Sequence, residues 1–532
     1  MPFFFASLMT LRFFIAALIL TILGGCASLP PGANYPRTKS TALADPDTTR
    51  LGSQFDRAAK AHGGNSAFRL IPAGIDGFLM RMQMIDSAEQ SLDMQYFIFR
   101  GDHAGRMLTD AVLRAADRGV RVRILLDDAA TKEGDEQITR LESHPLIEIR
   151  IFNPFSYRGH SAFLKAAEFM LHASRLDYRM HNKLLIADNA IALIGGRNIG
   201  DQYFQIDPAS QFADDDVFAA GPIVRKLSIS FDEFWNYDLS IPAVALQDER
   251  SPQAQKKQQR LEPEASGQIN DADYRQRAAS GEPLAGILAG RLPLVWARAR
   301  LVYDSPDKKN VENGRTVGRL LNGAVADAAF EVKHELLVIT PYLIPGREGM
   351  RLIETLRQRK VRVRILTSSL ESSTVLLAQA GYMHYRIPLL EEGVALYEIR
   401  SLLGDTRGSG ETAAISRYGH YSLHAKLFVF DRQRVFIGSM NFDQRSMHLN
   451  TEIGLIIDSP VLSEQIAERF DAMTLPVNAY HLVLHERDGE KSLAWRTREN
   501  KKEIEYSTEP AKSSWQRVGA DTLSWLPVDD EL

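Results

Sequence analysis

The segment His181-Asn-Lys-Leu-Leu-Ile-Ala-Asp188 returns later in the chain as His424-Ala-Lys-Leu-Phe-Val-Phe-Asp431. After six further residues each copy continues into a second short element, Gly195-Gly-Arg-Asn198 and Gly438-Ser-Met-Asn441. Histidine, lysine, aspartate, glycine and asparagine keep the same spacing in both copies, which a chance match does not produce. The chain is therefore expected to consist of two similar halves, each carrying one copy.

A second repeat lies upstream of each motif. Gly119-Val-Arg-Val-Arg-Ile-Leu-Leu126 returns as Lys360-Val-Arg-Val-Arg-Ile-Leu-Thr367, and a helical pattern and an apolar strand come before each. These helices and strands are expected at 107–116, 350–357, 91–99 and 335–343. Strand, helix and strand with short links indicate βαβ units. We therefore predict an α/β fold in which each half has a mixed, largely parallel sheet flanked by helices.

Length and composition limit the possible classes of protein. A chain of 532 residues that is 45% hydrophobic can bury at least two domain-sized cores and is not mostly disordered. The net charge of -4 gives no basic field, so no nucleic-acid partner is expected. The single cysteine excludes an intramolecular disulfide and any zinc site built from several cysteines.

That cysteine, Cys26, follows an apolar stretch at 13–23 that Arg12 precedes. A charged start, a short apolar region and small residues at its end are typical of a secretory signal rather than of a membrane span. Leu23-Gly-Gly-Cys26 resembles a bacterial lipobox, which implies acylation of Cys26 and stable membrane anchoring. Because Ala27 and Ser28 follow, we expect a periplasm-facing lipoprotein of the outer membrane. The alternative is an uncleaved anchor in the inner membrane, and the start codon is Met1 or Met9.

The organisation of the chain follows from the repeats and from changes in composition. The expected segments are a lipoprotein signal at 1–25, a tether at 26–50, an N-terminal domain at 51–245, a connector at 246–300, a C-terminal domain at 301–490 and a tail at 491–532. The glycine-rich stretch 404–419 is interpreted as a lid or an ordinary surface loop.

The motif copies supply a definite set of chemical groups. Histidine and lysine two residues apart on a strand point to the same face, and the glycines at Gly196 and before Ser439 let another backbone approach closely. Lysines and asparagines can surround a tetrahedral anion, as in phosphoryl transfer. One histidine can attack phosphorus while the other protonates the leaving alkoxide and then deprotonates the incoming hydroxyl. No metal or other cofactor is expected, because lysines supply the positive charge.

Taken together, the two motifs resemble the phospholipase D superfamily, whose members have two fused α/β domains with one shared active site and a covalent histidine intermediate. The resemblance implies catalytic residues His181, Lys183, Asp188, His424, Lys426 and Asp431, and substrate-binding residues Asn198, Asn441, Gly196 and Ser439. It also implies supporting acids, Asp214 and Glu452, that hold the ring of the opposite histidine. Asp214-Asp215-Asp216 leaves three candidates for the first acid. We expect His181 to be the nucleophile and His424 the acid, although the pseudo-symmetry makes them nearly interchangeable.

Further segments narrow the resemblance to the bacterial cardiolipin synthase C group. They include Leu125-Leu-Asp-Asp128, Phe152-Asn-Pro-Phe155 and Gly438-Ser-Met-Asn-Phe-Asp-Gln-Arg-Ser446. That group transfers a phosphatidyl unit onto phosphatidylglycerol, typically from phosphatidylethanolamine. The implied partners are phospholipid substrates and a membrane surface; protein partners and the oligomeric state are left open.

Three functions remain open at this stage. A phosphatidyltransferase and a hydrolase, either a phospholipase D or less plausibly a nuclease, would use the same residues. A non-catalytic lipid-binding lipoprotein is disfavoured, because neither motif copy has lost a catalytic residue. The apolar segment 161–174 is interpreted as a core-facing helix or, alternatively, as a lipid contact. The tail, with Trp515 and Trp525, suits either a membrane interface or a buried position.

Overall fold

The computed structural model describes residues 31–129, 135–157, 159, 161–206, 211–246, 281–403 and 420–525. The expected signal with Cys26, most of the connector and the glycine-rich stretch 404–419 lie outside the described residues. Within these ranges no helix combines the length and the apolar character needed to cross a bilayer.

Both predicted βαβ units are present. The N-terminal unit consists of β2 (Ser91–Tyr96), α4 (His103–Asp117) and β3 (Arg121–Asp127), and β4 (Ile147–Phe152) follows it. The C-terminal unit consists of β11 (Glu335–Ile339), α14 (Gly346–Gln358) and β12 (Arg362–Ser368), and β13 (Ala395–Ile399) follows it. Within each set the three strands pair in parallel. The alternating Val-Arg-Val-Arg pattern therefore marks the second strand of each unit.

The strands beside these units are antiparallel, so each half has a mixed sheet in which the parallel pairs are those of the βαβ strands. In the N-terminal half they are β1 (Ser66–Ile71), β5 (Leu184–Ala187), β6 (Ile191–Gly195), β8 (Asp216–Ala220) and β9 (Ser240–Pro242); in the C-terminal half they are β15 (Leu427–Phe430), β16 (Arg434–Gly438) and β17 (Ile453–Asp458). A two-residue turn after each motif makes β5 antiparallel to β6 and β15 antiparallel to β16. Asp188 and Asn189, like Asp431 and Arg432, have φ between 50 and 53°, the conformation of a tight hairpin.

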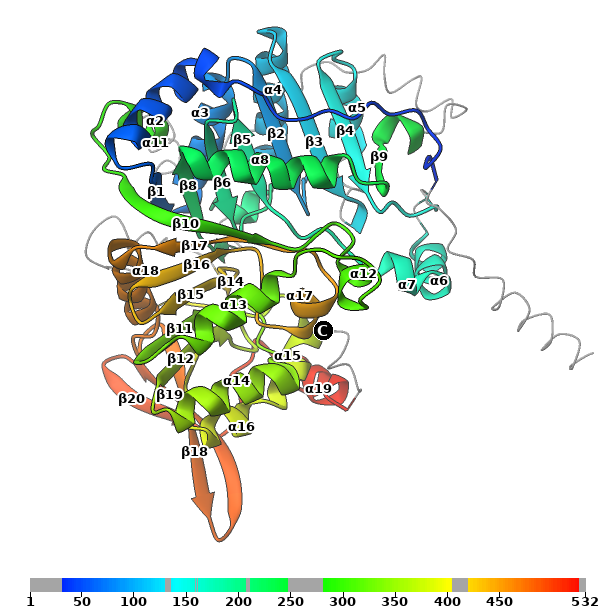
Figure 1. Ribbon diagram of the computed structural model, residues 1–532. Helices are drawn as coiled ribbons and strands as arrows, with labels where there is room; N and C mark the ends of the chain where they lie inside the picture. Colours follow the sequence, from blue (N-terminus) through cyan, green and yellow to red (C-terminus); the bar gives the residue numbers. More distant parts are fainter. Residues whose placement is uncertain are drawn as a thin grey trace, which may run out of the picture.

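Strand β10 (Val295–Tyr303) joins the two halves. It pairs antiparallel with β1 through residues 295–297 and with β17 through residues 298–303, which makes one sheet of 18 strands. Figure 1 shows β10 crossing between the two halves. The predicted connector is therefore wrong at its C-terminal end, because residues 295–300 are part of the sheet.

Two other predicted boundaries also need correction. The tail at 491–532 is not separate, since β18 (Ala479–Arg487), β19 (Glu490–Glu499) and β20 (Lys502–Tyr506) extend the sheet and α19 (Ser514–Leu523) follows. The expected free tether at 26–50 is too long. Arg37 donates to the carbonyl of Asp238 at 2.9 Å, Ala42 donates to Asp232 at 2.9 Å, and α2 (Arg50–Ala61) begins at Arg50. Residues from 37 onward are thus part of the folded N-terminal half.

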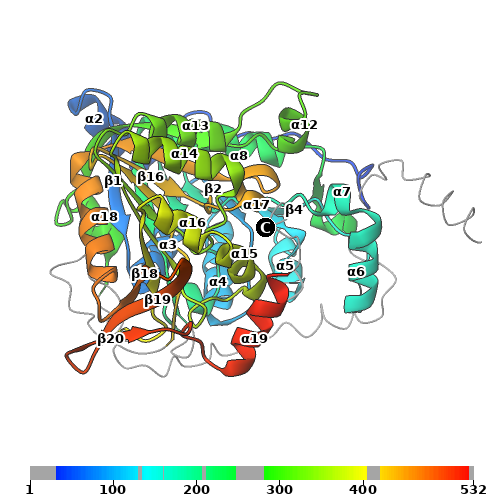
Figure 2. The same cartoon turned by 90° about the horizontal axis from the view of Figure 1, so that it is seen from below.

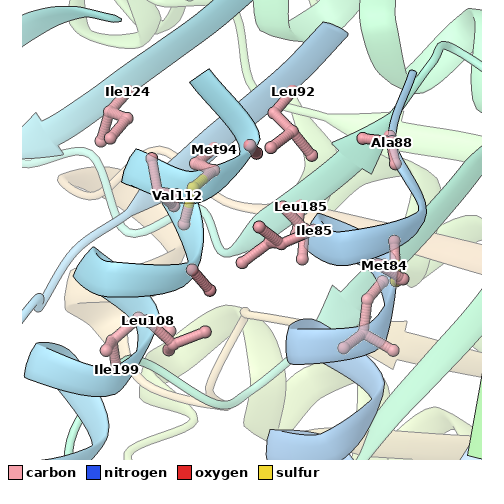
Figure 3. Packing of buried hydrophobic residues seen from close by; sticks show 14 of the residues in the cluster. Met84, Ile85, Ala88, Leu92, Met94, Leu108, Val112, Ile124, Leu185 and Ile199 are labelled. Carbon is pink, nitrogen blue, oxygen red and sulfur yellow. The ribbon is translucent and has the colours of Figure 1, made fainter. Parts of the chain in front are cut away.

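Helices cover both faces of each half. In the N-terminal half, α3 (Gly74–Ser87) and α4 cover one face and α8 (Pro222–Trp235) the other; in the C-terminal half, α13 (Leu321–Phe330) and α14 lie opposite α18 (Pro460–Met473). Figure 3 shows Met84 of α3 and Val112 of α4 beside Leu92 of β2 and Leu185 of β5, in a core made of the apolar positions that the periodicity indicates. A further core contains Phe231 of α8 and residues of both halves. The two halves are therefore packed on each other as well as joined by β10.

The remaining helices are short and lie mostly at the ends of the strands. They are η1 (Pro46–Thr48), α5 (Asp135–Glu142), α6 (Ala162–Leu171), α7 (Ala173–Leu176), η3 (Asp201–Tyr203), η4 (Ala243–Leu246), α11 (Pro283–Leu288), α12 (Lys308–Glu312), α15 (Leu376–Met383), α16 (Arg386–Glu391) and α17 (Gln444–His448).

Candidate active site

The two motif copies meet where short segments of opposite halves pair. β7 (Gln211–Ala213) runs parallel to β14 (Tyr421–Leu423), and the amide of His424 donates to the carbonyl of Ala213 at 2.8 Å. In the other pair, Met180 bridges to Thr451, and the amide of His181 donates to the carbonyl of Thr451 at 2.9 Å. Because Ala213 precedes Asp214 and Thr451 precedes Glu452, each histidine lies next to an acid of the other half.

These acids bind the imidazole rings across the interface. Nδ1 of His181 is 3.0 Å from both carboxylate oxygens of Glu452, and Nδ1 of His424 is 2.5 Å from Oδ2 of Asp214. A carboxylate at Nδ1 fixes the tautomer of the ring, so that Nε2 presents its lone pair. The two supporting acids thus contact the opposite histidines, in the arrangement that the resemblance implied.

The structure also distinguishes the three consecutive aspartates. Asp215 pairs with Arg469 at 3.2 Å, whereas Asp216 pairs with Arg81 at 2.8 Å. Asp214 alone reaches a motif histidine. Its position is equivalent to that of Glu452. Gly195 pairs with the residue two positions after Asp214, and Gly438 pairs with the residue two positions after Glu452.

The two lysines are buried beside the histidines. Nζ of Lys183 donates to the carbonyl of His181 at 2.7 Å and lies 5.5 Å from the centre of the Phe97 ring. Nζ of Lys426 donates to the carbonyl of His424 and lies 2.9 Å from its Nδ1. Burial lowers the pKa of Lys183 well below its usual value and that of Lys426 to about 8. Two poorly solvated amines are thus held where an anionic substrate would stabilise their charged forms most strongly.

The same burial acts on the histidines and the acids. Burial and the nearby lysines lower the pKa of His181 well below its usual value and that of His424 to about 3, so both rings are neutral in the free protein. Burial raises the pKa of Glu452 to about 7, against the opposing effect of Lys183. Burial would also raise the pKa of Asp214, but His424 and Lys426 lower it further, and the net shift is downward.

Gly196 and Ser439, predicted to bind substrate, lie against the two acids. A Cβ at Gly196 would lie 2.1 Å from Oδ1 of Asp214, so only glycine leaves room for this carboxylate. The hydroxyl of Ser439 donates to Oε2 of Glu452. Both positions thus help to place the two carboxylates, and their expected role in substrate binding stays a prediction.

The asparagines are also engaged by the protein. The amide nitrogen of Asn198 donates to the hydroxyl of Tyr203 at 3.0 Å, and its oxygen accepts from the amide of Ile98 at 3.1 Å. In the other copy the side-chain oxygen of Asn441 is buried without a hydrogen-bond partner, and the side chain hydrogen-bonds to Asp443. Asn198 therefore holds the segment after β2 in place, and its expected donation to a substrate anion stays a prediction.

The structure does not bring Asp188 and Asp431 to the histidines. Asp188 lies beyond β5, roughly 15 Å along the chain from Lys183 at the rise of a strand. Its oxygens accept from the amides of Glu89, Gln90 and Ser91 at 2.8–2.9 Å. Asp431 accepts in the same way from residues 333–335 at 2.7–2.9 Å. The implied catalytic role is thus corrected: each aspartate anchors the turn that leads into the first strand of its βαβ unit.

Several residues of the site were missed from the sequence. Asp304 accepts from the backbone amide of Glu452 at 2.9 Å, and the fully buried Lys308 donates to Asp304 at 3.1 Å. Aromatic rings enclose the histidines at 5.0–5.3 Å between centres: Phe97 at His181, and Tyr203 and Phe212 at His424. The only available signal was an acid and a lysine four residues apart after an apolar strand, which is too common to select them. In the described part of the chain, no three histidine, cysteine or acidic side chains are grouped to hold a metal ion.

Two fused α/β halves and two histidines, each held by an acid of the opposite half beside a buried lysine, define an enzyme of the phospholipase D type. The family described as "Cardiolipin synthase, PLD-like domain" matches residues 82–235 and 328–474, one range in each half. The chain belongs to this family.

Comparison with individual proteins agrees with this assignment. The chain is 38% identical over 489 residues to cardiolipin synthase C of Escherichia coli (strain K12), covering 90% of this chain and 99% of that protein. It is 29% identical over 518 residues to an uncharacterized protein of Helicobacter pylori (strain ATCC 700392 / 26695), covering 97% and 99%. Among solved structures, phosphatidylserine synthase of Haemophilus influenzae Rd KW20 matches with a TM-score of 0.50 at 13% identity, covering 79% of this chain and 90% of that one, and shares the fold.

Proposed function

We propose that the protein transfers a phosphatidyl group onto the headgroup glycerol of phosphatidylglycerol and so makes cardiolipin. The donor is phosphatidylethanolamine or a second phosphatidylglycerol. The observation that carries this proposal is the pair of histidines, each with an acid of the opposite half at Nδ1 and a buried lysine at its side. Similarity to a cardiolipin synthase over nearly the whole chain supports the choice of substrates.

In the first half-reaction, Nε2 of His181 attacks the phosphorus of the donor. The bond between phosphorus and the headgroup oxygen breaks, and the leaving alkoxide takes a proton from His424. Lys183 and Lys426 stabilise the charge on the non-bridging oxygens of the transition state. The product is a phosphatidyl group bound to His181 and a free alcohol, which is ethanolamine or glycerol.

In the second half-reaction, the glycerol hydroxyl of phosphatidylglycerol replaces that alcohol. His424 accepts the hydroxyl proton while the oxygen attacks phosphorus, and the bond between phosphorus and Nε2 of His181 breaks. Water in place of the hydroxyl would give phosphatidic acid. The rings of Phe97, Tyr203 and Phe212 around the histidines support transfer, because they limit the access of water.

The assignment of roles rests on the acids. An anionic phosphodiester in the site favours protonation of the nearby imidazoles, and the proton is held best where the carboxylate is ionised and closest. That carboxylate is Asp214, at 2.5 Å from His424. His181 lies beside Glu452, whose pKa is raised to about 7 by burial, and stays neutral and nucleophilic.

The test is incubation of the purified protein with vesicles of phosphatidylethanolamine, of phosphatidylglycerol, and of both lipids. Cardiolipin is the expected product wherever phosphatidylglycerol is present, and ethanolamine is released from the mixed vesicles in equal amount if phosphatidylethanolamine is the donor. Phosphatidic acid without cardiolipin would show a hydrolase. No lipid product in any arm would contradict the proposed function.

We also propose that the mature chain is a lipoprotein anchored through Cys26 and facing the periplasm, in the outer membrane. The lipobox-like sequence before Cys26 supports this placement. Mass spectrometry of the N-terminal peptide is expected to give an acylated Cys26 as the first residue. An intact N-terminus at Met1 or Met9 would support the alternative, an uncleaved anchor in the inner membrane.

A further inference from the structure

Helix α6 turns large apolar side chains toward solvent. Phe163, Met170 and Leu171 are 78%, 80% and 75% exposed, and Leu164 is also exposed. The interpretation of this segment as a core-facing helix is therefore wrong. A soluble protein seldom leaves so many neighbouring large apolar side chains uncovered unless they meet another surface.

The polar residues of α6 point the other way. The carboxylate of Glu168 accepts from the amides of Ser156 and Tyr157 at 2.6 and 2.8 Å, and Nζ of Lys165 lies 5.1 Å from the centre of the Phe155 ring. The helix is thus reversed with respect to an ordinary surface helix, because its charged groups contact the protein and its apolar groups face outward.

Helix α19 and the residues after it repeat this arrangement. Trp515 and Trp525 are 84% and 88% exposed, and Val518 is exposed between them. Two polar side chains of the helix turn inward, whereas Asp521 and Thr522 are exposed. Gln516 donates to the carbonyl of Leu370 at 2.7 Å, and Arg517 donates to that of Glu509 at 3.0 Å. Exposed tryptophans beside an apolar surface suit the boundary between water and lipid.

A series of contacts links each of the two helices to residues next to the active site. Glu168 of α6 holds the segment that follows Phe155, and the amide of Phe155 donates to Asp128 at 2.6 Å. The residue before Asp128, Asp127, accepts from the amide of Met180, and Met180 directly precedes His181. In the second series, α19 packs on α15, which follows Thr374. The hydroxyl of Thr374 lies 3.3 Å from the hydroxyl of Tyr342. The next residue, Leu343, forms a β-bridge with Phe442, and Phe442 directly follows Asn441 of the second motif.

The start of the folded chain lies near α6. Figures 1 and 2 both show α6 and α19 away from α18, with the first described residues near α6 and α7. Gly32 is packed against Ile241 and Ala245. Cys26 is only six residues earlier, a span of at most about 20 Å, so a lipid anchor there would hold α6 close to the membrane.

We propose that a docking face, made of the exposed apolar side chains of α6, of α19 and of Trp525 just after it, inserts into the interfacial region of a phospholipid bilayer and brings the site to its substrate. The residues of the docking face are Phe163, Leu164, Phe169, Met170, Leu171, Trp515, Val518 and Trp525. The proposal rests on the proposed function, because a site for phospholipids needs lipids that are delivered from a bilayer. Apolar side chains at the interface, with a covalent anchor nearby, give the combination that stable peripheral attachment requires.

The first test compares two forms of the same substrates. The triple variant Phe163→Asp, Met170→Asp, Leu171→Asp is assayed in the full chain on vesicles of phosphatidylethanolamine and phosphatidylglycerol, and on dihexanoyl forms of both lipids below their micelle concentration. Turnover on vesicles is expected to fall at least 10-fold, with turnover of the dispersed lipids unchanged. The matched control is Ile229→Asp, Phe330→Asp, Val461→Asp, three exposed apolar residues on α8, α13 and α18.

Unchanged turnover of the vesicles by the first triple variant would overturn the docking face, as would an equal loss in the control. A loss on both forms of the substrate would show damage to the site and count against the proposal. If the unsubstituted protein turns over neither form, the proposed function fails, and the docking face is then judged by fluorescence alone.

The second test needs no turnover. Lipids with brominated acyl chains quench tryptophan only at short range, so they are expected to quench the protein in vesicles, and Trp515→Phe, Trp525→Phe is expected to remove most of that quenching. The control is Trp296→Phe on β10, which should retain it. Equal quenching in the double variant and the parent would contradict insertion of α19.

Discussion

The two halves of the active site carry the same motif but hold their histidines with different acids. His181 meets Glu452 through both carboxylate oxygens at 3.0 Å, whereas His424 meets Asp214 through one oxygen at 2.5 Å. Behind the acids the halves differ again, because the hydroxyl of Ser439 binds Glu452 and Gly196 merely leaves space for Asp214. The repeat is thus symmetric in its backbone and asymmetric in the groups that control the protons, which is where a nucleophile and an acid have to differ.

The largest expected effect comes from removing either imidazole. His181→Ala and His424→Ala should each lower phosphatidyl transfer by at least about 10⁴-fold, because the residues of such a site act as a unit. A p-nitrophenyl ester of phosphatidic acid separates the roles, since its leaving group needs no proton. We expect this ester to restore cleavage in His424→Ala and not in His181→Ala, measured by release of p-nitrophenol. Rescue of His181→Ala alone, or a phosphohistidine trapped at His424, would reverse the assignment.

Neutralising the acids should give the next largest difference between the halves. Asp214→Asn removes an ionised partner of the imidazolium and should lower kcat by about 10³-fold. Glu452→Gln keeps an acceptor for Nδ1 of His181 and should cost about 10-fold. The comparison is made by steady-state kinetics on mixed vesicles. Equal losses would mean that the difference between the carboxylates has no catalytic consequence.

Exchanging the small residues behind the acids should give a smaller difference between the halves. Gly196→Ser places a Cβ where Asp214 lies and should lower activity about 100-fold by displacing that carboxylate. Ser439→Gly removes one hydrogen bond to Glu452 and should lower it only a few-fold. Initial rates for both variants test this order, and a milder effect of Gly196→Ser would contradict the steric account.

The pH profile of kcat/KM should show the same asymmetry. Burial raises the pKa of Glu452 to about 7, and its protonated form would donate to Nδ1 of His181 and place the ring proton on Nε2. Activity should therefore rise as the pH increases through about 7. It should fall above about 8, the pKa to which burial lowers Lys426, as that cation is lost. Glu452→Gln should abolish the acidic limb and keep the alkaline one; an unchanged acidic limb would assign it to another group.

The smallest effect on chemistry is expected at Asp188 and Asp431. Asp188→Ala leaves amide groups at the start of β2 without acceptors and should cost about 2–3 kcal/mol of stability. Asp431→Ala should cost less, because this side chain is only partly buried and water can replace it. Thermal unfolding measures both, and the rate per folded molecule should stay within a factor of two. A large loss of kcat in a folded Asp188→Ala would restore a catalytic role.

Sequence reasoning reached the βαβ units and the paired motifs, since alternation and spacing are local properties. It named Asp214 as the supporting acid but could not exclude Asp215 and Asp216, because their roles depend on which arginine or histidine the fold brings near. It assigned Asp188 to catalysis because this residue belongs to the same sequence motif as His181. In the structure, β5 lies between the two residues and separates them in space. The exposure of Phe163 was equally out of reach, since apolar periodicity is the same for a helix that faces a core and one that faces outward.

The shared strand β10 has a consequence for the synthesis of the chain. Until residues 295–297 leave the ribosome, β1 in the nascent N-terminal half has an open edge, which is a template for pairing with another chain. The active site is also incomplete at this stage of synthesis. His181 gains its carboxylate only with Glu452, and β17, which completes the pairing of β10, follows at residues 453–458. The polypeptide on the translating ribosome therefore stays inert at least until Glu452 and β17 have been synthesised, and catalysis begins only after these late contacts form.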